Sequence, residues 1–245
     1  MHKTILFDQL TPVALYGKIK EIFPAEVTML FESVVNTNDG NFSFITIGAQ
    51  ERLTYKDNTT TYTDQSGMKK ILNEDPFNFL KTYYRAIDKA AYKEKALEVG
   101  FSFVDGFIGF IAYDMVKVFE PVLEESMGDL LDPLNTPELD LVRPKIIIAY
   151  SHKSAKLTLI LNDASMKESM LSIENILKNS CTPMPLKAVE LQGEGTFSIG
   201  EERFKILVEE SKENIRSGDI FQILLSNRYT QKGKIDPLSF YRILR

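Results

Sequence analysis

The sequence has few of the residues that build disulfides, metal centres and catalytic triads. Its 245 residues include one cysteine, two histidines and no tryptophan. The lone Cys181 excludes an internal disulfide and a cysteine-rich metal site, and it is typical of a protein from a reducing compartment. His2 and His152 are far apart in the sequence, and SHKSAK around His152 predicts a polar turn. A Ser–His–Asp triad built on His152 is therefore the less favoured interpretation.

Long apolar runs and charge of one sign are also missing. No apolar run approaches the roughly 20 residues of a membrane-spanning helix, and the N-terminal MHKTILFDQLTP lacks the apolar core of a signal peptide. The net charge is −5 without a long run of either sign, which argues against a nucleic-acid-binding surface. The composition, 44% apolar and 26% charged, is typical of a soluble globular protein. We therefore expect a cytoplasmic protein with no nucleic-acid and no membrane partner.

The first part of the chain has the signals of an antiparallel sheet and one short helix. Thr11-Pro12 combines an N-cap residue with proline at the first helical position, so we expect a helix over residues 13–22. Asn38-Asp39-Gly40-Asn41 and Asp57-Asn58 are typical of hairpin turns. The strands expected around these turns are residues 27–31, 42–47, 52–55 and 60–63.

The middle of the chain alternates between helices and strands. Asp75-Pro76 predicts the start of a helix, and apolar residues at helical spacing predict another over residues 163–179. Gly106 and Gly109, within the aromatic run 101–114, predict a buried strand where another backbone or a bulge comes close. The other expected elements are a hairpin of residues 144–150 and 156–161 and an acidic surface loop at residues 124–138.

Residues 197–228 have the clearest local pattern in the chain. Ser198 and Glu201 match a capping box, in which each side chain satisfies a free N–H at a helix start. An apolar stripe then predicts a helix that ends at Gly218, because glycine suits the left-handed position after a helix. The apolar run 220–225 predicts a strand buried on most of both faces.

Polar groups that could do chemistry are sparse. Gln222 interrupts the apolar run 220–225, and a buried amide must find hydrogen-bond partners. It is therefore either a structural bridge or a group presented to a cavity. The sequence has no phosphate-binding glycine loop, and no carboxylate pair is singled out as a magnesium ligand.

One segment is a candidate domain boundary. Residues 181–195, with two prolines, are typical of a linker. Asp236-Pro237 starts one more helix, and the sequence ends about two turns later. We therefore expect two domains, residues 1–190 and residues 196–245, with the chain truncated inside the second.

The C-terminal motifs SGDIFQILLSNRY and DPLSFYRILR resemble the start of the chorismate-binding domain of the anthranilate synthase component I family. Weaker similarity lies upstream, in the order that the family has. The similar segments are LFES at 30–33, FSFI at 42–45 and FIGFIAYDMVK at 107–117. Asn41, Ala112 and Lys117 replace an arginine, a glycine and an arginine of the family pattern.

The resemblance implies a fold and an activity. The fold is α+β, with large antiparallel sheets packed face to face and helices outside. The enzyme is a lyase that uses Mg²⁺ to convert chorismate and ammonia to anthranilate and pyruvate in tryptophan biosynthesis. A glutamine amidotransferase subunit supplies the ammonia, and tryptophan inhibits by binding in the N-terminal part. The tryptophan-binding residues that the resemblance implies are Glu32, Ser33 and Ser43.

The residue type at position 222 distinguishes this chain from some of the neighbouring families. Isochorismate and salicylate synthases resemble this segment but carry a lysine there, which acts as a general base on water. A neutral amide has no pKa near neutrality, so Gln222 is expected beside the active site without an acid–base role, and it favours ammonia as the nucleophile. Aminodeoxychorismate synthase of the folate pathway shares the glutamine but has a different strand motif, and it is the alternative.

The resemblance also implies what this chain lacks. In the family, the Mg²⁺-binding glutamates, the acid–base histidine and most chorismate contacts follow the DPLSFYRILR helix. We therefore expect no metal ligands in this chain and little or no activity from the 245 residues alone. The alternative from another class is a non-catalytic module that binds tryptophan or an amidotransferase.

Overall fold

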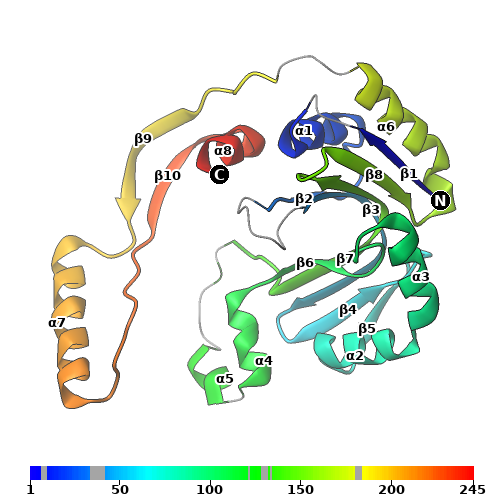
Figure 1. The fold of residues 1–245 in the computed structure, drawn as a ribbon. Coiled ribbons are helices and arrows are strands. Elements are labelled where there is room, and N and C mark those ends of the chain that lie inside the picture. Colours follow the sequence, from blue (N-terminus) through cyan, green and yellow to red (C-terminus); the bar gives the residue numbers. More distant parts are fainter. Residues whose placement is uncertain (7–9, 34–41, 121, 128–131, 133, 180–183) are drawn as a thin grey trace. The chain divides into compact units, whose positions relative to one another are not determined.

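The computed structural model describes residues 1–6, 10–33, 42–120, 122–127, 132, 134–179 and 184–245 (Figure 1). The chain divides into two compact units, Met1–Met184 and Pro185–Arg245, which are called unit 1 and unit 2. The predicted turn at Asn38–Asn41 lies outside the described residues. In the described part, none of the helices has the length and apolarity that a membrane crossing requires.

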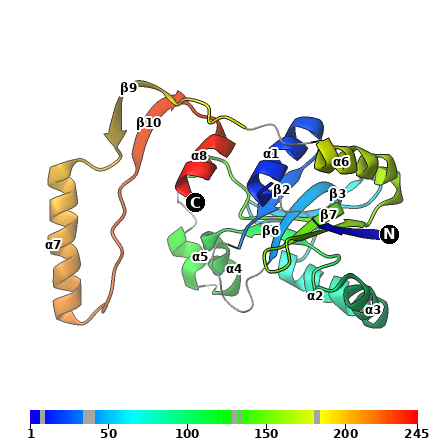
Figure 2. The ribbon, with the colours of Figure 1, turned by 45° about the horizontal axis from the view of Figure 1, so that its top comes forward.

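Unit 1 is built on a curled antiparallel sheet with helices on both of its faces (Figures 1 and 2). Within the described residues this sheet has eight strands in the path β1-β8-β7-β3-β4-β5, while β2 pairs with β3 and β6 with β7. The strands are β1 His2–Leu6, β2 Thr28–Phe31, β3 Phe42–Lys56, β4 Thr59–Thr63, β5 Lys69–Leu72, β6 Ile108–Ile111, β7 Leu139–Ser151 and β8 Lys156–Leu161. The helices are α1 Pro12–Ile22, α2 Pro76–Ala86, α3 Lys89–Val99, α4 Val116–Phe119, α5 Val122–Met127 and α6 Lys167–Asn179.

Strand β7 is continuously apolar in its centre because helices cover both faces of the sheet there. Ile146 and Ile148 belong to a core cluster with residues of α1 and α6. Ile147, between them, points to the other face and belongs to a cluster that α3 packs against. Successive strand residues face opposite ways, so burial on both faces requires an unbroken apolar run.

A β-bulge in β3 joins two predicted strands into one. The expected strands at 42–47 and 52–55 form a single strand of 15 residues. The pairing with β7 shifts by one residue between Ala49 and Glu51, so Gln50 is the extra residue. The Gln50 amide donates to the Pro144 carbonyl at 2.8 Å. Pro144 is tolerated inside a central strand because it lies at this irregularity.

Local turn and cap signals predicted most of the remaining elements of unit 1. Asp57 and Asn58 both have positive φ and close the β3–β4 hairpin, as predicted. Thr11 and Asp75 accept hydrogen bonds from backbone N–H groups at the starts of α1 and α2. The β7–β8 hairpin and the helix before Asn179 are also confirmed, although that helix begins with a 3₁₀ turn at Ala164–Met166.

Two predictions for unit 1 were wrong. The buried strand expected within 101–114 is only β6, whose Phe110 and Ile111 are exposed. The close backbone approach is confirmed, since a Cβ on Gly109 would lie 2.0 Å from the Asp140 carbonyl oxygen. The loop expected at 124–138 is wrong for residues 124–127, which belong to α5, whereas residues 134–138 form no helix or strand, as expected. Both errors have the same cause. Composition indicates whether a segment is apolar or acidic, but it does not show how many of its residues pair with a neighbouring strand or join a helix.

Unit 2 contains the β9–β10 hairpin-like pair and two helices. The elements are β9 Glu190–Phe197, α7 Glu201–Ser217, β10 Tyr229–Lys234 and α8 Pro237–Leu244. Strand β9 occupies part of the predicted linker and pairs antiparallel with β10. The end of α7 at Gly218, with φ of 85°, and the Asp236 cap of α8 are as predicted.

The capping box at Ser198 was wrong. Gly200 is the N-cap of α7, and it has no side chain to make a capping hydrogen bond. The Ser198 hydroxyl instead accepts from the Arg228 N–H at 3.2 Å and donates to the Asn227 side-chain oxygen at 3.1 Å. Pairing between the two ends of this segment therefore replaces the local cap.

Candidate functional site

The residues implied to bind tryptophan lie where β2 and β3 meet. Phe31 is opposite Phe44 in this antiparallel pair. This pairing is the last of the β2–β3 register, so Glu32 follows the end of β2 and Ser43 precedes Phe44 on β3. The segments that contain the implied residues are therefore neighbours in the sheet, with Glu32 and Ser33 in the two positions after β2. Asn41, which replaces the arginine of the family pattern, lies outside the described residues.

Ser43 has a partner that the sequence did not reveal. Its side chain is 1% exposed, and its hydroxyl lies 2.7 Å from Nε2 of His152. The His152 ring packs edge-on against Tyr150, with the centroids 5.0 Å apart. No described carboxylate hydrogen-bonds to His152, and the buried Ser43 hydroxyl is not accessible for attack on a substrate. The pair therefore ties the start of β3 to the residue that follows β7, and the arrangement does not have the geometry of a Ser–His–Asp triad.

Gln222 is not on a buried strand, so that prediction was wrong. Residues 220–228 form no strand, and the side chains around Gln222 are open to solvent, with Phe221 93% and Leu224 90% exposed. An apolar run becomes a buried strand only where neighbouring strands accept its backbone hydrogen bonds and cover its faces. Among the described residues nothing does so. The Gln222 amide likewise has no hydrogen-bond partner in the described part of the chain.

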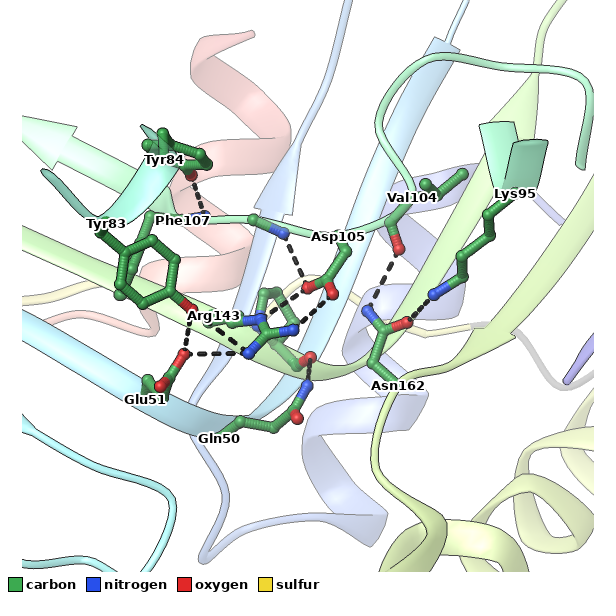
Figure 3. Close-up of polar contacts among 12 residues, drawn as sticks. Gln50, Glu51, Tyr83, Tyr84, Lys95, Val104, Asp105, Phe107, Arg143 and Asn162 are labelled. Atoms are coloured by element: carbon green, nitrogen blue, oxygen red, sulfur yellow. Dashed lines mark hydrogen bonds and ion pairs between the residues drawn. The ribbon is translucent and has the colours of Figure 1, made fainter. Parts of the chain in front are cut away.

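A network of hydrogen bonds and ion pairs surrounds Arg143 on the sheet (Figure 3). Arg143 holds Asp105 with two hydrogen bonds, Nε–Oδ1 at 2.8 Å and Nη2–Oδ2 at 2.6 Å. Its Nη1 donates to Glu51 Oε2 at 3.0 Å and to the Tyr83 hydroxyl at 3.2 Å. Glu51 is only 6% exposed. The network therefore joins β3, β7, α2 and the segment before β6.

The β3 bulge places this network. Beyond the bulge, Glu51 is directly opposite Arg143, so the two charges form a cross-strand pair. Without the extra residue, the alternation of β3 would turn the side chain of Glu51 to the other face. The sequence analysis missed these residues. The signal was the presence of charged residues within each of two largely apolar strands, but local periodicity does not show that Glu51 and Arg143 face each other.

Two tyrosine hydroxyls also donate hydrogen bonds to the Glu51 carboxylate. Tyr62 donates to Oε1 at 2.5 Å and Tyr83 to Oε2 at 2.6 Å. Burial, together with the hydrogen bond to the Glu51 carboxylate, raises the pKa of both Tyr62 and Tyr83 well above the ordinary value. The hydrogen bonds to Asp105 raise the pKa of Arg143, so its guanidinium stays charged. The cluster thus carries two carboxylates and one cation, with hydroxyl donors stabilising the excess negative charge.

Alkaline pH is expected to destabilise unit 1 through Tyr62 and Tyr83. Their pKa is raised in the folded state, so the folded chain retains protons that tyrosines of the unfolded chain release near about pH 10. Their contribution is therefore complete below that pH and is lost as the pH rises above it. Thermal unfolding followed by circular dichroism from about pH 9 to about pH 11 checks this. Tyr62→Phe should reduce the fall of the thermal midpoint with rising pH. Tyr113→Phe, at a residue that is 89% exposed, should leave that fall unchanged.

The described residues do not fit a metal site. No group of three or more histidine, cysteine, aspartate or glutamate side chains in the described ranges is arranged to hold a metal ion. The carboxylates of the Arg143 network are already taken up by the guanidinium and the tyrosine hydroxyls. No step of a reaction is therefore assigned to a metal held by this part of the chain.

A family model described as chorismate binding enzyme matches residues 29–245. The chain belongs to this family. Anthranilate synthase component 1 of Lactococcus lactis is 26% identical over 252 residues, which cover 99% of this chain and 51% of that protein. The Thermus thermophilus protein of the same name is 28% identical over 248 residues, which cover 99% of this chain and 50% of that protein.

A solved structure shares the fold of this chorismate-binding family member. Anthranilate synthase component I from Streptococcus pneumoniae superimposes with a TM-score of 0.60 at 22% identity, covering 98% of this chain and 51% of that one. The α+β class is therefore confirmed, with one curled antiparallel sheet in unit 1. The chain spans about half the length of the curated relatives it matches.

Proposed function

We propose that this chain is the N-terminal half of an anthranilate synthase component I, which converts chorismate and ammonia to anthranilate and pyruvate in tryptophan biosynthesis. The observation that carries the proposal is similarity to proteins named anthranilate synthase component 1 over essentially the whole chain, 99% for the Lactococcus lactis protein. Within the proposal, the complete enzyme uses Mg²⁺ and receives ammonia from a glutamine amidotransferase subunit. The packing of large sheets face to face also belongs to the complete protein.

Gln222 supports ammonia as the nucleophile. A side-chain amide is neutral across the physiological pH range and cannot take a proton from water, whereas a lysine at this position can act as a general base. The motif SGDIFQILLSNRY around Gln222 is the anthranilate type rather than the aminodeoxychorismate type. Aminodeoxychorismate synthase, in the folate pathway, is the second candidate because it shares the glutamine.

The junction of β2 and β3 supports a regulatory tryptophan site in unit 1. Glu32 and Ser33 follow the end of β2, and Ser43 lies on β3, next to Phe44, which pairs with Phe31. Because the Ser43 hydroxyl is held by His152, Ser43 acts in this proposal by ordering the site, and Glu32 and Ser33 supply the contacts to the ligand. The competing proposal is a module that binds tryptophan or an amidotransferase without catalysis.

An assay of the product encoded by the full reading frame tests the function. We expect chorismate, Mg²⁺ and ammonium to give anthranilate, detected by its fluorescence, and tryptophan to inhibit. The 245 residues alone should give little or no turnover. Chromatographic identification of aminodeoxychorismate would favour the second candidate. Tryptophan binding without any turnover by the full product would favour the non-catalytic module.

Gln222→Lys in the full product should lower kcat/KM for anthranilate formation by about tenfold or more, equivalent to about 1.4 kcal/mol of transition-state stabilisation. The lysine replaces a neutral amide with a cation and a potential general base, so a small amount of water addition should accompany the loss. Gln192→Lys makes the same change at an exposed position of β9 and should leave the rate unchanged. Equal kinetics for the Gln222→Lys variant and the parent would return Gln222 to a structural role.

A further inference from the structure

A cavity of about 610 Å³ opens beside the Arg143 network in unit 1. Residues of α2, of α3 and of the segment before β6 line it, and Glu32, Ser33 and Ser43 are not among the lining residues. Small-molecule sites typically occupy about 300–1,000 Å³, so this volume suits a ligand of one or two rings. Among the described residues, those that line it belong to unit 1.

The walls of the cavity are aromatic. Tyr84 from α2, Tyr92 from α3, and Phe103 and Phe107 from the connecting segment line it. Gly106 lets this segment pass close to Tyr84, because a Cβ there would lie 3.1 Å from the Tyr84 hydroxyl in a backbone conformation, φ of 129°, that other residues rarely adopt. Walls of this kind favour a flat apolar ring, which can pack edge-on or offset against them.

The floor of the cavity is polar and rigid. Asp105 and Arg143 line it and neutralise each other through two hydrogen bonds (Figure 3). Arg143 is itself held by Glu51 and Tyr83, so neither charge is free to move toward a ligand without breaking the network. Glu51, which carries the remaining negative charge of the network, is not among the lining residues and is bound by two tyrosine hydroxyls, so the floor itself contributes shape and fixed dipoles rather than a net charge.

The unneutralised charge at the cavity is positive. Lys89 and Lys93, four residues apart on α3, both line it and therefore lie on one face of that helix. Neither has an ion-pair partner among the described residues. The Tyr84 hydroxyl accepts the Phe107 N–H at 2.8 Å, and in the described part its own proton has no acceptor. Two ammonium groups and one hydroxyl donor are thus available to an anionic ligand.

We propose that this cavity binds a small aromatic carboxylate. The ring packs among Tyr84, Tyr92 and Phe107, and the carboxylate receives hydrogen bonds from Lys89 and Lys93. A cationic ligand of the same shape is disfavoured by repulsion from the two lysines. A polar anion without a ring gains nothing from the aromatic walls, so both the ring and the carboxylate are required.

Calorimetric titration of the chain with 2-naphthoate tests the proposal, with 2-(aminomethyl)naphthalene as the cationic counterpart. We expect saturable binding of the carboxylate, weaker at high salt because exposed charges are screened, and no saturable binding of the amine. Lys89→Ala combined with Lys93→Ala should weaken 2-naphthoate binding by about tenfold, the loss expected for removing charge-assisted hydrogen bonds.

Matched variants locate the binding. Lys81→Ala removes an exposed lysine of α2 that does not line the cavity, and it should leave the affinity unchanged. Ser33→Ala at the end of β2 should also have no effect, which separates this cavity from the proposed tryptophan site. Thermal midpoints equal to that of the parent show that the variants fold. No saturable binding of 2-naphthoate, equal binding of the amine, or an affinity insensitive to the double lysine change would overturn the proposal.

Discussion

Arg143→Ala is expected to lower the free energy of unfolding of unit 1 by about 3–5 kcal/mol, the loss seen when one partner of a buried ion pair is removed. The change leaves Glu51, which is 6% exposed, without its cation. It also removes both hydrogen bonds that hold the Asp105 carboxylate. The size of the effect comes from these two uncompensated charges rather than from the strength of the original pairs.

Urea unfolding followed by far-UV circular dichroism measures this effect. Arg143→Lys keeps the charge but not the planar fork that binds Asp105 with two hydrogen bonds, so we expect an intermediate loss. Arg216→Ala removes an arginine from a solvent-exposed pair with Glu213 on α7 and should change stability by less than about 0.5 kcal/mol.

A second substitution separates an unpaired charge from lost packing. Glu51→Gln in the Arg143→Ala background removes one of the two stranded charges while keeping the shape of the side chain. It should recover part of the stability if the buried charge causes the loss. No recovery, together with an Arg143→Ala value close to that of Arg216→Ala, would show that the network contributes little to the fold.

Local sequence signals predicted the elements whose causes are themselves local. Thr11-Pro12, Asp75-Pro76 and Asp236-Pro237 each start a helix where the proline lacks the N–H that a first turn leaves unpaired. Asp57-Asn58 closes a hairpin because both residues accept positive φ. In each case two adjacent residues determine the backbone, so a single sequence is sufficient.

Predictions failed where a distant segment decides the outcome. Ser198 has the spacing of a helix cap, but it bonds to Arg228 and Asn227, 30 and 29 residues away. The run at 220–225 has the composition of a buried strand, yet no described strand pairs with it. Apolar composition shows that a segment is suited to burial, whereas the partner that buries it is not encoded within the segment.

The candidate sites also differ in how far the sequence alone could predict them. The sequence predicted Glu32, Ser33 and Ser43 only through the family resemblance, and the strand register then showed that β2, which precedes Glu32, pairs with the part of β3 that follows Ser43. The Arg143 network escaped prediction because one inserted residue, Gln50, brings Glu51 opposite Arg143. A bulge reverses the facing of every later residue in its strand, and periodicity read from the sequence cannot locate it.

Ile148→Ala is expected to lower the free energy of unfolding of unit 1 by about 2–5 kcal/mol, because the lost apolar contacts are accompanied by a cavity that the core cannot fully close. Ile148 is 1% exposed on the central strand β7 and packs in the cluster shared by α1, α6, β3 and β8. Its neighbours are fixed by strands on both sides, so relaxation into the space is limited and the upper part of the range is favoured.

The matched control for Ile148→Ala is Ile71→Ala on β5. Ile71 is 74% exposed, so the same three carbons are already in water and the change should be within about 0.5 kcal/mol. Urea unfolding with an unchanged slope would assign the difference to native-state packing rather than to a different unfolded state. If both variants lost the same stability, the two-sided burial of β7 would not be what holds unit 1 together, and the continuous isoleucine run would need another explanation.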